Sequence, residues 1–174
     1  MKKRMTLVLA SLMMSITLPG RGFLTEVQAA DSERPFKPFS KEVRGVLDNS
    51  EKFILLSVNP SPIKGDDKRE SFYGHRVLGK LEIKDSKLKR ELLTALNAAV
   101  EKGCEEKAIP SCFNPRHGIT AIAGTNEVNL LICFECMQIY IIRGNEKELT
   151  LVTHYPAGLF NGTLHEAGVP LAQQ

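Results

Sequence analysis

The stretch Asp85-Ser-Lys-Leu-Lys-Arg-Glu-Leu-Leu-Thr-Ala-Leu-Asn-Ala-Ala-Val-Glu-Lys-Gly103 carries the most regular pattern in this chain of 174 residues. Its apolar residues recur at helical spacing and its charged residues fall on the opposite side, which predicts a helix over about 86–102. The predicted buried stripe consists of Leu88, Leu92, Leu96, Ala99 and Val100. A side-chain oxygen of Asp85 or Ser86 can cap the first turn, and Gly103 is placed to end the helix in a left-handed conformation.

Short apolar runs on both sides of this helix predict β-strands, at 53–58 and 77–83 before it and at 119–123, 128–142 and 149–153 after it. The last three are expected to form an antiparallel meander within 118–155, because glycine-containing turns separate them. Residues 59–71 predict a loop, and 158–168 predict a short final helix that ends at Gly168. Strands and helices that do not alternate regularly indicate the α+β class. We therefore expect an antiparallel sheet of about five strands, packed against the 86–102 helix and the short C-terminal helix.

The N-terminal residues have the order of a secretory signal peptide. A basic start at 2–4 precedes an apolar run over 5–18, and Val27-Gln-Ala29 offers small residues for cleavage. The run is short for a membrane-spanning helix, which needs about 20 apolar residues, so no transmembrane anchor is expected after cleavage. We therefore divide the chain into a signal peptide (1–29), an N-terminal tether (30–50) and a single domain (51–174). Export to the periplasm or the extracellular space follows from this division.

The positive charge of the chain belongs mostly to the signal peptide. The whole chain has a formal net charge of +3, and residues 1–29 hold four basic residues against one acidic residue. The remaining chain is therefore close to neutral, and its charge gives no support for binding to nucleic acid. No nucleic-acid partner is expected, and the sequence identifies no other partner.

Four cysteines, at 104, 112, 133 and 136, are the candidates for disulfides in an exported chain. Cys133 and Cys136 fall in a segment with strand character, where they would lie about 10 Å apart and point to opposite faces. A disulfide needs Cα atoms within about 7 Å, so the better prediction is a cross-link into the sheet from the preceding loop, which holds Cys104 and Cys112. The alternative is a bulge that brings Cys133 and Cys136 together and gives them a thiol-redox role.

A structural zinc site is a second alternative for the cysteines. Cys112, His117, Cys133 and Cys136 have the residue types of such a site. The site needs reduced thiols and a knuckle-like turn between the paired cysteines, and the two residues between them supply no glycine for it. We therefore expect no cofactor, with zinc as the alternative.

Cys112-Phe-Asn-Pro-Arg-His-Gly118 is the densest polar cluster in the chain. Its Asn-Pro pair favours a turn and Gly118 can take a positive φ, which would project Arg116 and His117 from the rim of the sheet. Arginine can bind a carboxylate or phosphate and histidine can transfer a proton near neutral pH. The candidate catalytic residues are therefore His117, Arg116 and Glu135. In the purely structural interpretation, Arg116 pairs with a nearby acid and His117 bonds a backbone carbonyl.

The same residues resemble those of an uncharacterised family of exported bacterial proteins. The resemblance rests on Cys112-Phe-Asn-Pro-Arg-His-Gly-Ile119 and Ile132-Cys-Phe-Glu-Cys136, and more loosely on Tyr73-Gly-His-Arg-Val-Leu-Gly79 and the ending Leu164-His-Glu-Ala-Gly-Val-Pro-Leu171. It covers residues 52–172 and implies a shared architecture in which the Pro-Arg-His-Gly turn and the cysteines at 133 and 136 belong together. It implies no particular chemistry.

Three functions remain compatible with the sequence. The first is a non-catalytic binding or structural domain of the envelope or the extracellular space, stabilised by disulfides. This function is favoured because the chain lacks Ser/His/Asp, paired-carboxylate and phosphate-cradling glycine signatures. The second is a thiol-redox or zinc-binding protein that uses Cys133 and Cys136 with Cys112 and His117. The third is a hydrolase-like enzyme that uses His117 and Arg116.

Overall fold

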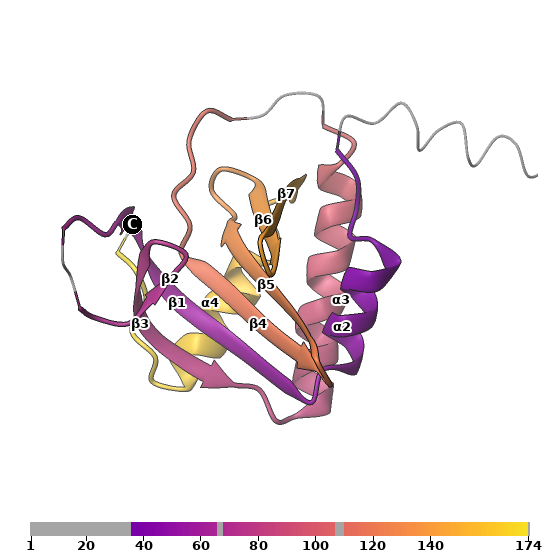
Figure 1. Ribbon diagram of the computed structural model, residues 1–174, viewed down its shortest axis with the longest axis horizontal. Helices are drawn as coiled ribbons and strands as arrows, with labels where there is room; N and C mark the ends of the chain where they lie inside the picture. Colours follow the sequence, from indigo (N-terminus) through magenta and orange to yellow (C-terminus); the bar gives the residue numbers. More distant parts are fainter. Residues whose placement is uncertain (1–35, 66–67, 107–109, 174) are drawn as a thin grey trace, which may run out of the picture. The chain divides into compact units, whose positions relative to one another are not determined.

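The computed structural model describes residues 36–65, 68–106 and 110–173, and these residues form an α+β domain. The expected signal peptide (1–29) and the start of the expected tether lie outside the described residues. Along the chain the elements are α2 (Lys41–Asn49), β1 (Lys52–Pro62), β2 (Ser71–Phe72), β3 (His75–Glu82), α3 (Ser86–Gly103), β4 (His117–Ala123), β5 (Asn126–Cys133), β6 (Gln138–Arg143), β7 (Glu146–Leu151) and α4 (Ala157–Glu166) (Figure 1). No helix among the described residues is long and apolar enough to cross a membrane.

All seven strands form one antiparallel sheet in the order β2-β3-β1-β4-β5-β6-β7. β1 lies inside the sheet, and α3 connects β3 to β4, the two strands that flank it. The predicted α+β class with an antiparallel sheet is confirmed, but the sheet has seven strands where about five were expected. Two differences account for this: the short β2 falls at the end of the predicted loop, and the predicted strand 128–142 is two strands joined by a turn.

The β5–β6 turn, residues 134–137, interrupts an apolar run that predicted a single strand. Met137 adopts a positive φ of 54°, and its N–H bonds the carbonyl of Phe134 at 3.3 Å. The two strands then pair in antiparallel register, starting from Cys133 opposite Gln138. Both strands are largely buried on both faces, so the sequence is apolar on either side of the turn. No Gly, Pro or Asn marks the turn itself, which is why the pattern concealed it.

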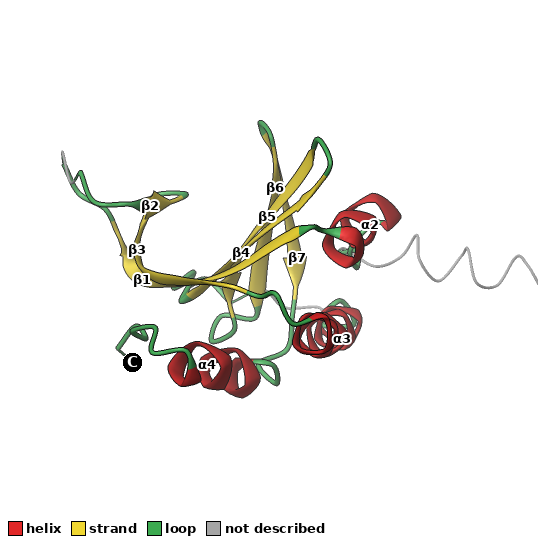
Figure 2. Ribbon diagram, turned by 90° about the horizontal axis from the view of Figure 1, so that it is seen from below, coloured by secondary structure: helices red, strands yellow, loops and turns green. Residues whose placement is uncertain are grey.

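Apolar side chains cover both faces of the sheet, because neighbouring residues of a strand point to opposite sides. On one side, where α3 and α4 lie (Figure 2), the main core forms between sheet and helices. On the other side a smaller cluster contains Leu56, Val58, Phe72, Leu131 and Ile142. Phe72 packs directly on Gly118, where an added Cβ would lie 2.7 Å from the ring. Gly118 is therefore needed for this close contact, and it does not take the positive φ expected from the sequence.

α3 confirms the main predicted helix. Its buried face contains Leu92, Leu93, Leu96, Ala99, Val100 and Gly103. Asp85 caps its first turn, with Oδ1 2.7 Å from the backbone nitrogen of Lys87. Gly103 was expected to end the helix in a left-handed conformation, but it is the last helical residue and has no positive φ. Its role is close packing instead, because a Cβ there would lie 2.6 Å from the backbone nitrogen of Val152, just after β7.

α2 lies within the segment expected to be an N-terminal tether and corrects that expectation for residues 39–50. Phe39, Val43 and Leu47 are at most 2% exposed and belong to the main core. Val43 and Leu47 are four positions apart and so fall on one face of α2, and Phe39, just before the N-cap residue, joins the same core. Ser40 caps this helix, its Oγ accepting the N–H of Val43 at 3.2 Å. Prolines and charges at the start of the segment concealed this short amphipathic pattern.

Candidate functional site

A cavity of about 360 Å³ lies between the segment before β4, the β5–β6 turn and the first turn of α4. Its lining combines polar side chains with an aromatic wall and includes Arg116, His117, Phe134, Glu135 and Asn161. The three candidate residues predicted from the sequence, Arg116, His117 and Glu135, therefore line one cavity. Asn114, His154 and Ala157 complete the lining.

His117 is the first residue of β4 and is only 4% exposed. Its ring contacts those of Phe134 and Phe160, at centroid distances of 5.3 and 5.9 Å, and these two rings also contact each other. Its Nε2 lies 2.8 Å from Oδ1 of Asn161, on α4. An amide oxygen only accepts, so Nε2 carries the hydrogen and Nδ1 is an acceptor. The expected bond to a backbone carbonyl is thus replaced by a bond to a side chain.

His117 is neutral at physiological pH. Burial is the main cause, and it lowers the pKa of the imidazole from 6.5 to about 4. The nearby Arg116 adds to this effect, while the hydrogen bond to Asn161 opposes it. Nδ1 is buried and has no hydrogen-bond partner among the described residues. The same is true of Oγ of Ser57, which sits opposite His117 in the β1–β4 register. Two polar atoms therefore lie unpaired in the interior on one side of the sheet.

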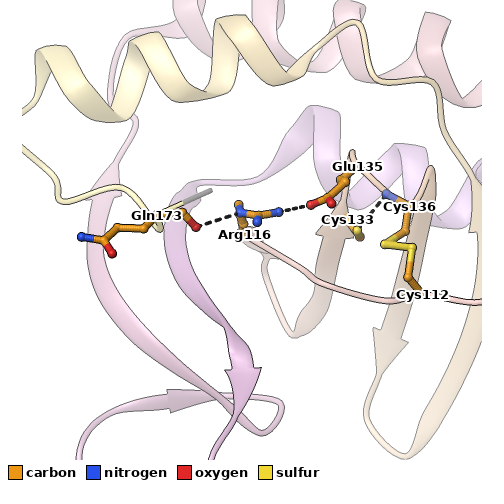
Figure 3. Close-up of polar contacts among 6 residues, drawn as sticks. All are labelled: Cys112, Arg116, Cys133, Glu135, Cys136 and Gln173. Carbon is orange, nitrogen blue, oxygen red and sulfur yellow. Dashed lines mark hydrogen bonds and ion pairs between the residues drawn. A yellow bond between two sulfur atoms is a disulfide. The ribbon is translucent and has the colours of Figure 1, made fainter.

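Arg116 forms an ion pair with Glu135 through Nη1 and Oε2, and its Nε lies 3.4 Å from the carbonyl oxygen of Gln173. Figure 3 shows the guanidinium lying between the β5–β6 turn and the C-terminal segment. The Arg116 side chain is 23% exposed and the Glu135 side chain 58%. The ion pair with a nearby acid that the structural interpretation expected for Arg116 is therefore present. Because that acid is the third candidate residue, the pair closes one rim of the cavity.

The cysteines lie beside this rim. Cys112 and Cys136 form a disulfide, with Cα atoms 5.8 Å apart (Figure 3). This confirms the predicted cross-link from the loop before β4 into the sheet. The geometric premise was wrong, however, because Cys133 ends β5 and Cys136 lies in the turn, so the two do not share one regular strand. Cys133 and Cys104 are free and buried.

The zinc alternative does not fit this arrangement. Cys112 and Cys136, two of its four proposed ligands, are joined to each other. His117, the third, is buried against two phenylalanine rings and donates through Nε2 to Asn161. In the part of the chain that the structure describes, no cluster of three or more His, Cys, Asp or Glu side chains is arranged to hold a metal ion.

Asn161, Phe134 and Phe160 are the site residues that the sequence analysis did not single out. Asn161 is 44 positions from His117 in the sequence, and only the packing of α4 on the sheet brings them together. The sequence offers one weak signal: Asn161 is a polar residue between the apolar Phe160 and Leu164 of a short helix. Phe134 could not be predicted as a site residue, because it lies within an apolar run that was predicted to be one long strand.

Comparison of the chain with protein-family models, with curated proteins and with solved structures found no match.

Proposed function

We propose that the protein is an exported, non-catalytic binding domain whose cavity between Arg116, His117 and Phe134 takes a small molecule with an acidic group and an apolar body. The observation that carries the proposal is the cavity itself, which gathers polar and aromatic side chains from three separate segments. Concave sites with apolar walls and a few placed polar groups are the usual form of small-molecule sites. Export is inferred from the N-terminal sequence pattern.

The polar lining favours an acidic ligand because it is rich in hydrogen-bond donors. Arg116 lines the cavity and uses one Nη1 hydrogen for Glu135 and its Nε for Gln173, so a guanidinium with five N–H donors retains further hydrogens for a ligand. The amide oxygen of Asn161 is occupied by His117, so its NH₂ group is the part left for a ligand. α4 begins at Ala157 without a side-chain cap, and its first N–H groups add positive potential at the same place.

The apolar part of the ligand has a wall to contact. Phe134 is 4% exposed and packs against the rings of His117 and Phe160, so its position is fixed. Ala157 lines the cavity from the opposite element. A rigid aromatic wall beside an arginine suits a planar or aliphatic acid better than a fully polar ion.

Catalysis is disfavoured by the positions of the candidate groups. Cys112 is held in a disulfide and cannot act as a nucleophile. Ser57, which sits opposite His117 in the register, is 0% exposed and does not line the cavity. A pKa of about 4 makes His117 a weak base at neutral pH. Glu135 is paired with Arg116, so none of the residues named in the hydrolase-like alternative is a free nucleophile or a free base.

Phenylacetate is a suitable probe, with the uncharged phenylacetamide as its control. In titrations followed by NMR, phenylacetate is expected to shift the signals of the cavity residues and to bind about tenfold more tightly than phenylacetamide, because it gains a charge-assisted bond to Arg116. Arg116→Gln is expected to remove this preference. Arg44→Gln, which removes an arginine from a surface ion pair with Glu101, is the matched control and is expected to keep it. Equal binding of the two probes, or an unchanged preference in Arg116→Gln, would contradict the proposal.

A further inference from the structure

Three cysteines meet at the β5–β6 turn, and only two of them are joined. The backbone N–H of Cys136 lies 3.0 Å from the Sγ of Cys133, so the free sulfur sits directly beside a residue of the disulfide (Figure 3). Cys133 ends β5 and Cys136 is the third residue of the 134–137 turn, so only two residues separate them along the chain. A backbone nitrogen lies about 1.5 Å from its own Cα, so the Sγ of Cys133 is within about 4.5 Å of the Cα of Cys136. Cys136 can therefore reach either of two partners.

We propose that Cys133 is the internal nucleophile of a disulfide exchange in which the Cys112–Cys136 bond is replaced by a Cys133–Cys136 bond. The Cys133 thiolate attacks the Sγ of Cys136, the bond between Cys136 and Cys112 breaks, and Cys112 leaves as a thiolate that takes up the proton lost by Cys133. One disulfide and one thiol are present before and after, so the step needs no external oxidant or reductant. The proposal concerns the cysteines alone and does not depend on the ligand proposed for the cavity.

The surroundings of Cys133 favour a slow exchange, because the thiol must lose its proton before it can attack the disulfide. Burial raises the pKa of the thiol, and the nearby Glu135 carboxylate acts in the same direction. Backbone N–H groups of Cys136 and Asn114, together with the charge of Arg116, oppose this by stabilising the thiolate. The attacking thiolate is therefore scarce near neutral pH, although hydrogen-bond donors are already in place for it. The rate of exchange is expected to rise with pH.

The exchange moves a reactive group from the interior to the surface. Cys133 and Cys136 are 0% exposed, whereas Cys112 lies on an exposed segment. Before the exchange the free thiol at this turn is buried, and after it the free thiol is accessible. The released segment is then held by weaker contacts, such as the bonds from Gln138 Nε2 to the carbonyl of Cys112, at 3.1 Å, and to that of Pro110, at 2.6 Å. An exposed Cys112 thiol can attack the disulfide of another molecule, which forms a mixed disulfide with one sulfur of that molecule and releases the other as a thiol.

The experiment maps which cysteine an alkylating reagent labels. The oxidised protein is incubated with N-ethylmaleimide at pH 7, 8 and 9 under native conditions, quenched with acid, digested with pepsin and examined by mass spectrometry. Label on a Cys112 peptide no longer linked to the 133–136 peptide is the expected result, with a rate that rises about tenfold per pH unit below the pKa of Cys133. Label on Cys133, with the Cys112–Cys136 disulfide still present, would show that the turn opens without any exchange of disulfide partners. This result would overturn the proposal.

Two variants sharpen the test. Cys133→Ala is expected to abolish labelling of Cys112, because no internal nucleophile remains. Cys104→Ala is the matched control, since Cys104 is also a buried free thiol but its Sγ lies 3.3 Å from Thr150 Oγ1, on β7. It is expected to leave the labelling of Cys112 unchanged. Cys112 labelling that persists in Cys133→Ala, or protein that purifies with three free thiols and bound zinc at the turn, would refute the exchange. The mapping on the unmodified chain decides the question even if Cys133→Ala folds poorly.

Discussion

Acidification is expected to destabilise the domain through His117, and the size of the effect follows from its burial. The pKa of His117 is 6.5 in a solvated chain and about 4 in the folded protein. Between these values the unfolded chain binds a proton that the folded protein excludes. The contribution of His117 to stability is therefore fully present above pH 6.5 and is lost as the pH falls towards 4. From pH 7.5 to 5 the loss amounts to about 2 kcal/mol in the free energy of unfolding, and it approaches about 3 kcal/mol at pH 4.

Urea denaturation followed by far-UV circular dichroism measures this loss, since the chain contains no tryptophan for fluorescence. His117→Gln keeps a polar side chain that does not titrate, so its free energy of unfolding is expected to change about 2 kcal/mol less than that of the unmodified protein over the same pH range. Carboxylates contribute equally to both proteins and cancel in this difference. His154→Gln changes an exposed histidine of the same cavity and is the control, with the pH dependence expected to remain. Identical pH dependence in His117→Gln and the unmodified protein would refute the reasoning.

Three further predictions concern the disulfide, the packing of two glycines and the cap of α3. Each compares the free energy of unfolding, measured by urea denaturation at pH 7.5. Joint replacement of Cys112 and Cys136 by alanine removes a cross-link across 24 positions of sequence and is expected to cost about 3 kcal/mol, whereas a cost near zero would mean that the loop is held by its other contacts. Gly103→Ala is expected to lower the free energy of unfolding by about 2 kcal/mol, because the added Cβ would lie 2.6 Å from backbone atoms. Gly45→Ala is expected to raise it by about 0.5–1 kcal/mol, because a Cβ there meets nothing within 4 Å and alanine favours the helix. The opposite order of the two variants would contradict the packing argument. Asp85→Ala is expected to cost about 1 kcal/mol and Asp85→Asn much less, and an equal loss in both would show that charge, not capping, is what Asp85 contributes.

The elements that could be predicted from the sequence are those whose pattern depends on one buried face. α3 combines a long apolar stripe with a capping Asp85, so local pattern and tertiary burial agree. β3 was predicted from the alternation at its end, whereas β1, which is buried on both faces, was predicted as a short apolar run. The β5–β6 turn was not predicted from the sequence. Strands buried on both faces show no alternation of polar and apolar residues, and no glycine indicates the turn within the apolar run. α2 was missed because the apolar pattern of its segment consists of few buried residues, Phe39, Val43 and Leu47, which is too short to indicate a helix.

The residues of the candidate site also include some that could be predicted from the sequence and some that could not. Arg116 and His117 could be predicted because they stand together in a polar cluster beside a cysteine, and such clusters are rare in this chain. Their partners lie far along the sequence: Glu135 is 19 positions from Arg116, and Asn161 is 44 positions from His117. Glu135 was a candidate because the sequence predicted it on the strand adjacent to the turn that holds Arg116 and His117. Asn161 depends on how α4 docks on the sheet, and no local pattern encodes that docking.

The β5–β6 turn links the cavity to the cysteines, since four consecutive residues serve both. Phe134 packs on His117 and Glu135 pairs with Arg116, while Cys133 and Cys136 on either side of them provide the thiol and the disulfide. A change of partner at Cys136 must alter the backbone of a turn whose side chains form one wall of the cavity. Any ligand that prefers one arrangement of Phe134 and Glu135 must then shift the disulfide equilibrium by the same free energy with which the disulfide shifts its binding. The tight turn that the sequence concealed is thus the feature through which the pairing of the cysteines and the binding of a ligand would influence each other.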